Sequence, residues 1–359
     1  MLYRLIYYFH TDYSFLNVFR YITLRTMYAT LTALLLSLLL GYWIIPWLRR
    51  LQIGQYIRDN GPPNHKDKAG TPTMGGSFLL LSIIISSLLW VEPRNLYIWL
   101  VLVVAILFGG IGFVDDYLKV IRKSSRGLRA WSKFSMQVGI AFFVGIMLYN
   151  YADFDSRLSF PFVKDFLPDL GKGYIILVIL VVVGASNAVN LTDGLDGLAI
   201  GPIIIAFLSY LVFSYLAGHI KIASYLLIPY VSGAGELSVV CGAVVGASMG
   251  FLWYNTYPAQ VFMGDAGSLS LGAVLGMIAL ISKQEITLIL VGGIFVVEAL
   301  SVILQVAFFK ITGGRRIFRM APIHHHFELK GWPEPKVTIR FWIIAIMLAL
   351  LSMSTLKLR

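Results

Sequence analysis

Residues 97–118 read YIWLVLVVAILFGGIGFVDDYL, an apolar run of bilayer length that ends in two adjacent aspartates, Asp115 and Asp116. A helix needs about 20 apolar residues to cross the hydrocarbon core of a membrane. Nine other runs have the same character, so the sequence predicts an all-α polytopic membrane protein with about ten transmembrane helices. The predicted runs are approximately 25–48, 75–92, 97–118, 132–152, 174–190, 199–217, 236–254, 266–283, 286–309 and 337–356.

The composition of the whole chain supports a membrane protein. Hydrophobic residues make up 58% of the 359 positions and charged residues 13%, more apolar surface than a soluble protein of this length could bury. Residues 1–24 are aromatic and of mixed polarity, so we interpret them as an interfacial segment that precedes a single domain over residues 25–359. We attribute the net charge of +11 to loops facing anionic lipid, and expect no nucleic-acid partner.

Basic residues predict the orientation of the spans. Lysines and arginines gather in the loops after the first, third and ninth runs, which the positive-inside rule places in the cytoplasm. Both termini are then extracytoplasmic, although Arg25 at the outer end of the first run opposes this orientation. The same topology brings three groups of carboxylates to the cytoplasmic side: Asp115 with Asp116, Asp193 with Asp196, and Asp265.

Carboxylates gathered at a membrane edge are unfavourable unless a cation compensates them. Mg²⁺ fits such a group, because it takes oxygen ligands and binds through one or two carboxylates together with substrate phosphates. Asp265 could instead cap the helix that follows it, but beside the other aspartates it is a candidate metal ligand. The sequence therefore predicts a magnesium site in a cleft on the cytoplasmic side.

Two glycine-rich segments flank the aspartates in the sequence. In NAVNLTDGLDG (187–197), a helical backbone would place Asp193 and Asp196 on one face, and the glycines would let a ligand approach closely. HKDKAGTPTMGG (65–76) could supply a lysine and backbone donors to a phosphate, or could simply form a turn with helix caps.

Three further features are candidates for function. The basic stretch from Lys119 to Lys133 is expected to contact lipid headgroups, and one or two of its residues could hold a lipid phosphate. APIHHHFEL (321–329) could present imidazole donors to phosphates. Glu298 is an intramembrane charge, and the glycine pair at 292–293 predicts a break in the ninth helix.

Taken in order, GTPTMGG, the paired aspartates, NLTDGLDG, MGDAG and PIHHHFEL resemble the polyprenyl-phosphate N-acetylhexosamine-1-phosphate transferases over essentially the whole chain. Within them the chain is similar to the branch whose donor is UDP-MurNAc-pentapeptide. The resemblance implies transfer of phospho-MurNAc-pentapeptide to undecaprenyl phosphate, which yields lipid I and UMP, the first membrane step of peptidoglycan synthesis. It also implies Mg²⁺, a homodimer and the bacterial cytoplasmic (inner) membrane.

The resemblance further implies a role for individual residues. Asp265 would be the metal ligand, with Asp115 and Asp116 as further candidate ligands. Asp115 would act as a base on the lipid phosphate or as the attacking nucleophile, Asp116 would assist, and His324 would also be catalytic. The implied substrate-binding residues are Lys68, Thr73, Asn190, Asp193, Gly194, Leu195, Asp196, Asn255, Phe262, Gln305, His325 and His326.

Two other functions stay open. The first is the same chemistry with UDP-GlcNAc or a related sugar nucleotide as donor. The second is a lipid or solute transporter, for which we would expect inverted repeats and ionisable groups near the bilayer midplane. Only Glu298 lies that deep in the predicted spans.

Overall fold

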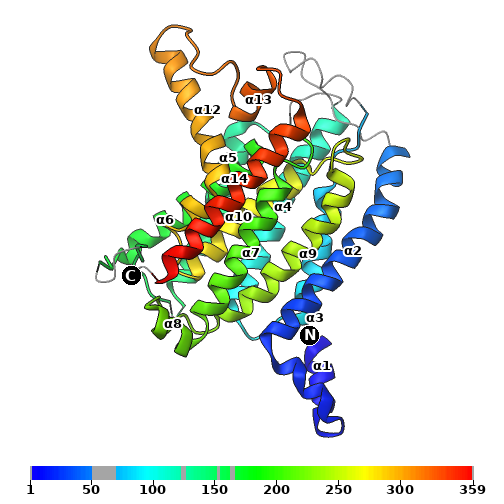
Figure 1. Ribbon diagram of the computed structural model, residues 1–359, viewed down its shortest axis with the longest axis vertical. Helices are drawn as coiled ribbons and strands as arrows, with labels where there is room; N and C mark the ends of the chain where they lie inside the picture. Colours follow the sequence, from blue (N-terminus) through cyan, green and yellow to red (C-terminus); the bar gives the residue numbers. More distant parts are fainter. Residues whose placement is uncertain (1, 51–69, 123–126, 152–153, 162–165, 358–359) are drawn as a thin grey trace.

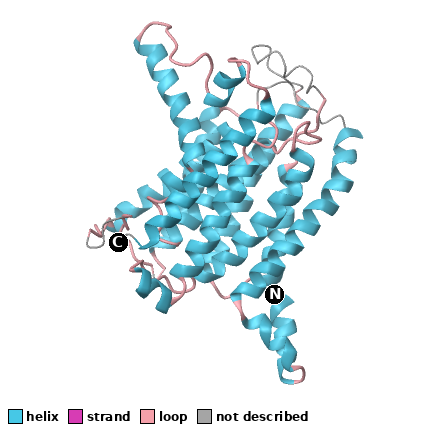
Figure 2. Cartoon of the chain, viewed as in Figure 1, coloured by secondary structure: helices cyan, strands magenta, loops and turns pink. Residues whose placement is uncertain are grey.

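A computed structural model of the protein describes residues 2–50, 70–122, 127–151, 154–161 and 166–357. Within these ranges the regular structure is helical and no strand forms (Figures 1 and 2). The α-helices are α1 Leu2–Tyr8, α2 Ile22–Arg50, α3 Gly76–Trp90, α4 Leu96–Ile121, α5 Ala130–Tyr149, α6 Tyr174–Thr192, α7 Ile200–Ala217, α8 Ile220–Leu226, α9 Leu237–Asn255, α10 Gly264–Ile281, α11 Leu288–Val291, α12 Gly293–Ile311, α13 Ile323–Glu328 and α14 Glu334–Ser354.

Each predicted run corresponds to a helix in the structure. Among the described residues, nine helices are long and apolar enough to cross a membrane. The remaining run forms α3, which has 15 residues and is shorter than the roughly 20 that a simple span needs. The prediction of an all-α, multi-pass membrane protein is therefore confirmed.

The predicted break in the ninth run is also present. Helix α11 ends at Val291, Gly292 adopts φ −88° and ψ 17°, and α12 starts at Gly293. Beyond the break, α12 extends away from the other helices at the upper left of Figure 1. The long loop that follows α12 contains the short helix α13.

Helix α10 forms the centre of the bundle, and 16 of its 18 residues are buried. Glycines let its neighbours pack backbone against backbone, as is common between membrane helices. A Cβ atom on Gly112 of α4 would lie 2.1 Å from the carbonyl oxygen of Asp265. A Cβ atom on Gly272 would likewise lie 2.5 Å from the carbonyl oxygen of Ala185 in α6. These contacts bring the ends of α4 and α6 beside the start of α10.

The opposite end of the bundle is closed by a buried ion pair. Arg25, near the start of α2, lies 2.5 Å from Glu236 at the start of α9, and its guanidinium also donates to the carbonyl oxygen of Trp90. Because Glu236 neutralises it, Arg25 does not argue against the predicted topology. Arg4 pairs with Glu92, and Lys357 donates to Tyr225, so both termini lie at this end (Figure 1).

Candidate active site

Three carboxylates meet where the end of α4 faces the start of α10. Ligand oxygens of Asp115, Asp116 and Asp265 all lie within 4.8 Å of one another. The side chains of Asp115 and Asp116 are almost fully buried, and that of Asp265 is 15% exposed. The structure thus brings together two of the carboxylate groups that the sequence placed on one side of the membrane. We call these three residues the aspartate cluster.

Two lysines compensate the charge of the aspartate cluster. Lys119 Nζ lies 2.7 Å from Asp115, 3.4 Å from Asp116 and 3.0 Å from Asp265. Lys133 Nζ lies 2.5 Å from Asp265 and 3.5 Å from Asp115. The sequence marked both as members of a basic stretch but not as site residues. Lys119 follows Asp115 by one helical turn, and that spacing was the available signal.

The aspartate cluster offers only carboxylate oxygens, which suit a hard divalent cation such as Mg²⁺. Neighbouring polar groups orient these oxygens. Asn190 Nδ2 donates to Asp265 Oδ1 at 2.8 Å and to Ser268 Oγ at 2.8 Å. The backbone N–H of Ala266 donates to Asp116 at 3.2 Å. Asn190, predicted to bind substrate, therefore lies directly against a candidate metal ligand.

Helix α6 ends at Thr192, and the chain then folds into a turn over residues 193–197. Asp193 and Asp196 consequently do not share the face of a helix, and this part of the prediction is wrong. Asp193 accepts a hydrogen bond from the backbone N–H of Gly264. Burial raises the pKa of Asp193 to about 8, and the charges of Asp265 and Asp116 add to this shift.

Asp196 and Asn255 attach the 193–197 turn to the loop that precedes α10. The Asp196 carboxylate accepts from the backbone N–H of Ala259 at 2.9 Å. Asn255 accepts from the Gly197 N–H at 3.2 Å and donates to the carbonyl oxygen of Val261 at 2.9 Å. Both predicted residues are thus buried and position backbone in this structure.

The remaining predicted residues of this region differ in their access to a ligand. Thr73 lies beside the aspartate cluster, since its hydroxyl would be 3.1 Å from a Cβ atom placed on Gly264. Phe262 is partly exposed, and its backbone pairs with residues 72 and 75. The Leu195 side chain is 4% exposed and packs in an apolar cluster with Phe341, so only its backbone can meet a ligand. Lys68 lies outside the described residues.

The three histidines of α13 have separate surroundings. His324 is fully buried, with Nδ1 3.1 Å from Glu298, and its ring lies against Gly194. His325 Nδ1 lies 2.7 Å from Glu328. His326 accepts from the backbone N–H of Arg319 at 3.1 Å. Gln305 of α12 holds the loop before α13 by accepting from two backbone N–H groups, those of Ile317 and Phe318.

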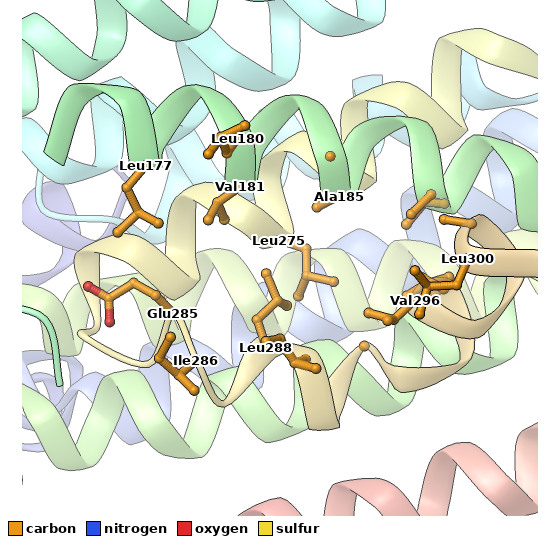
Figure 3. Close-up of a pocket in the computed structure, with 17 residues that line it drawn as sticks. Leu177, Leu180, Val181, Ala185, Leu275, Glu285, Ile286, Leu288, Val296 and Leu300 are labelled. Carbon is orange, nitrogen blue, oxygen red and sulfur yellow. The ribbon is translucent and has the colours of Figure 1, made fainter. Parts of the chain in front are cut away.

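An apolar cavity of about 330 Å³ lies between α6 and the broken ninth run (Figure 3). Leu177, Leu180 and Val181 line it at one end, near the single carboxylate of Glu285. It is also lined by Val189, the residue before Asn190. Because Asn190 donates to Asp265, the cavity leads along α6 toward the aspartate cluster. We call it the α6–α12 groove.

Comparison with known proteins identifies the family. The model of glycosyl transferase family 4 matches residues 98–283. The phospho-N-acetylmuramoyl-pentapeptide-transferase of Syntrophus aciditrophicus is 61% identical over 359 residues, and that of Desulforapulum autotrophicum is 58% identical over 359 residues, with both chains fully covered in each case. The enzyme of Desulfatibacillum aliphaticivorans is 60% identical over 344 residues, 96% of each chain. The resemblance found in the sequence motifs is confirmed: the chain belongs to the phospho-N-acetylmuramoyl-pentapeptide transferases of glycosyl transferase family 4.

Proposed function

We propose that the protein uses Mg²⁺ to transfer phospho-MurNAc-pentapeptide from UDP-MurNAc-pentapeptide to undecaprenyl phosphate on the cytoplasmic side of the bacterial inner membrane. The products would be lipid I and UMP. The observation that supports this proposal most strongly is the aspartate cluster, Asp115, Asp116 and Asp265, near the end of the apolar helix α4. A water-soluble anionic donor and a membrane-bound phosphate could meet only at such a boundary.

The aspartate cluster would hold the metal, with Asp265 as the principal ligand. Asp265 is the most exposed of the three carboxylates and is oriented by Asn190. Bound Mg²⁺ would neutralise the donor diphosphate and the departing UMP. Lys119 and Lys133 would then be free to leave the carboxylates and to contact phosphate oxygens, as a flexible ammonium group can.

The α6–α12 groove would hold part of the polyprenyl chain of the acceptor. Apart from Glu285 its lining is apolar, and it follows α6 over thirteen residues, from Leu177 to Val189. The helical rise between the first and the last of these residues is about 18 Å. A chain lying along this length would place its phosphate near Asn190, beside the aspartate cluster.

In the proposed reaction, an oxygen of the lipid phosphate attacks the phosphorus atom that carries the muramoyl sugar. The bond from that phosphorus to the bridging oxygen breaks, and UMP leaves with the electron pair. Asp115 would accept the proton that the lipid phosphate loses. Its position supports this role, because Asp115 lies near the end of α4, accepts from the backbone N–H of Leu128 and contacts Lys119 and Lys133.

The test uses the full chain purified in detergent, with Mg²⁺, undecaprenyl phosphate and either UDP-MurNAc-pentapeptide or UDP-GlcNAc. We expect UMP release with the first donor alone. Release with UDP-GlcNAc alone would contradict the proposed donor. An absence of UMP with both donors would contradict the proposed reaction.

A further inference from the structure

A buried contact between a carboxylate and an imidazole lies beneath the 193–197 turn. Glu298 Oε2 in α12 lies 3.1 Å from His324 Nδ1 in α13, and both side chains are 0% exposed. Glu298 belongs to an apolar helix of membrane-spanning length, where an uncompensated carboxylate is strongly unfavourable. A carboxylate retained at such a position calls for a functional explanation.

The other edge of the His324 ring faces the backbone of the turn. A Cβ atom on Gly194 would lie 2.3 Å from His324 Nε2 and 2.9 Å from Cε1. Only glycine leaves room for the ring at this distance. The imidazole is therefore enclosed between the Glu298 carboxylate on one side and Gly194 on the other.

The adjoining residue connects this contact to the aspartate cluster. Asp193, directly before Gly194, accepts a hydrogen bond from the backbone of Gly264, which precedes Asp265. A displacement of the His324 ring would therefore move the turn that faces the proposed metal site. Glu298 shares α12 with Val296 and Leu300, which line the α6–α12 groove, so one helix carries both the groove wall and the carboxylate that contacts His324.

We propose that Glu298 is a positioning residue of the donor site, which holds the His324 ring against Gly194 and thereby fixes the 193–197 turn. A carboxylate beside one ring nitrogen selects the orientation of an imidazole and determines which nitrogen faces the other way. With Nδ1 directed at Glu298, Nε2 is the edge that faces the turn. Neither ring nitrogen of His324 and neither carboxylate oxygen of Glu298 makes a hydrogen bond to the described residues, so the pairing rests on the 3.1 Å approach of Nδ1 to Oε2, and Nε2 is buried against the turn.

The inference rests on the proposed function, and its test measures KM for each substrate separately. Glu298→Gln keeps the size of the side chain but removes its charge. We expect it to raise KM for UDP-MurNAc-pentapeptide by about tenfold or more, since removing one member of a buried pair costs at least this much. KM for undecaprenyl phosphate should stay within about twofold, because the groove lining is intact. Glu298→Asp should recover part of the donor KM.

A double-mutant cycle distinguishes positioning from a general structural role. If Glu298 acts through His324, Glu298→Gln should have no further effect on donor KM in the His324→Ala background. Ser301→Ala is the matched control, because the Ser301 hydroxyl is buried in the same helix and donates only to the carbonyl oxygen of Glu298. Thermal unfolding in detergent verifies that each variant is folded.

Three outcomes would overturn the inference: an unchanged donor KM in folded Glu298→Gln, equal rises in both KM values, or additive effects in the cycle. Each of these outcomes can be measured only if the unaltered protein releases UMP. If the proposed function is wrong, the unaltered protein itself is inactive, and this result is distinct from the three outcomes.

Discussion

Lys133 Nζ lies 2.5 Å from Oδ2 of Asp265, the carboxylate that we propose as the principal ligand of Mg²⁺. Lys119 contacts the same oxygen at 3.0 Å. The three carboxylates carry a formal charge of −3 and the two ammonium groups carry +2, so the aspartate cluster with its lysines has a formal charge of −1. The lysines therefore supply the compensation that close carboxylates require, and a divalent cation would compete with them for the same oxygens.

Substitution of Lys119 by methionine tests this competition. Lys119→Met removes one positive charge while keeping most of the apolar stem, so Mg²⁺ should bind the variant more tightly than the unaltered protein. We expect a lower melting temperature without Mg²⁺ and a larger rise on its addition, as binding to the folded state requires. Thermal unfolding across a Mg²⁺ titration measures both effects.

Arg122→Met is the control for this experiment. Arg122 is exposed, and its guanidinium donates to the carbonyl oxygen of Gly127 rather than to a carboxylate. Its loss should leave the Mg²⁺-dependent rise unchanged. If Lys119→Met responds to Mg²⁺ as this control does, the lysine and the metal do not share a site.

Asp265→Asn should abolish turnover while the protein remains folded. The amide keeps the size of the side chain but cannot replace the charge of the metal ligand. Because a bound metal contributes several kcal/mol to charge stabilisation, we expect UMP release to fall by at least about a thousandfold. Asp169 is exposed and lies at the end of the bundle opposite the aspartate cluster, so Asp169→Asn should retain activity. Substantial turnover by folded Asp265→Asn would exclude Asp265 as an essential ligand.

The role of Asp115 can be determined without the lipid acceptor. A base needs the acceptor before any bond changes, so enzyme and donor alone should release far less than one equivalent of UMP. A nucleophilic Asp115 would instead release UMP stoichiometrically and retain the phospho-sugar. We expect the first result, measured by rapid quenching and by the intact mass of the protein. A phospho-sugar adduct that is absent from Asp115→Asn would contradict the single-step reaction.

Arg25→Met should destabilise the protein strongly, although it lies far from the aspartate cluster. The side chains of Arg25 and Glu236 are 4% and 13% exposed, and removing one member of a buried pair costs about 3–5 kcal/mol. Arg157→Met is a suitable comparison, because Arg157 and Asp155 are 57% and 47% exposed. Its loss should cost less than about 1 kcal/mol. Equilibrium unfolding in mixed micelles measures both. If Arg25→Met and Arg157→Met lowered the free energy of unfolding equally, burial would not explain the contribution of Arg25.

Hydropathy predicted the helices of this architecture, because it is a local property of a membrane helix. The ten runs follow from hydropathy, and the break at Gly292 follows from the glycine pair. The approach of Asp115 to Asp265 was expected from the loop charges, whereas the orientation that these charges imply stays a prediction. The predicted run 174–190 ends within two residues of α6, but the turn that follows Thr192 was not predicted. Residues 193–197 form a turn that Asn255 and Asp196 hold against another loop, and contacts between distant segments override local helical spacing.

The burial of His324 was not predictable for a similar reason. Three consecutive histidines in a predicted loop indicate exposed imidazoles, yet α13 places His324 at 0% exposure against Glu298. The partner lies 26 positions earlier, in a helix whose course depends on the break at Gly292. Sequence spacing does not carry such a relationship, whereas the intramembrane position of Glu298 did mark it as a candidate for function.

Filling the α6–α12 groove tests the proposed acceptor site. Gly184 lines this groove, and a Cβ atom there would have no neighbour within 4 Å. Gly184→Leu can therefore be accommodated without strain and would occupy space proposed for the polyprenyl chain. We expect KM for undecaprenyl phosphate to rise by about tenfold, with KM for the donor unchanged, since an excluded chain segment loses its apolar contacts. Gly139→Leu is the matched control: Gly139 also has open space, but lies in α5 outside the groove. If both variants gave the same KM for undecaprenyl phosphate in the UMP-release assay, the assignment of the groove to the acceptor would be contradicted.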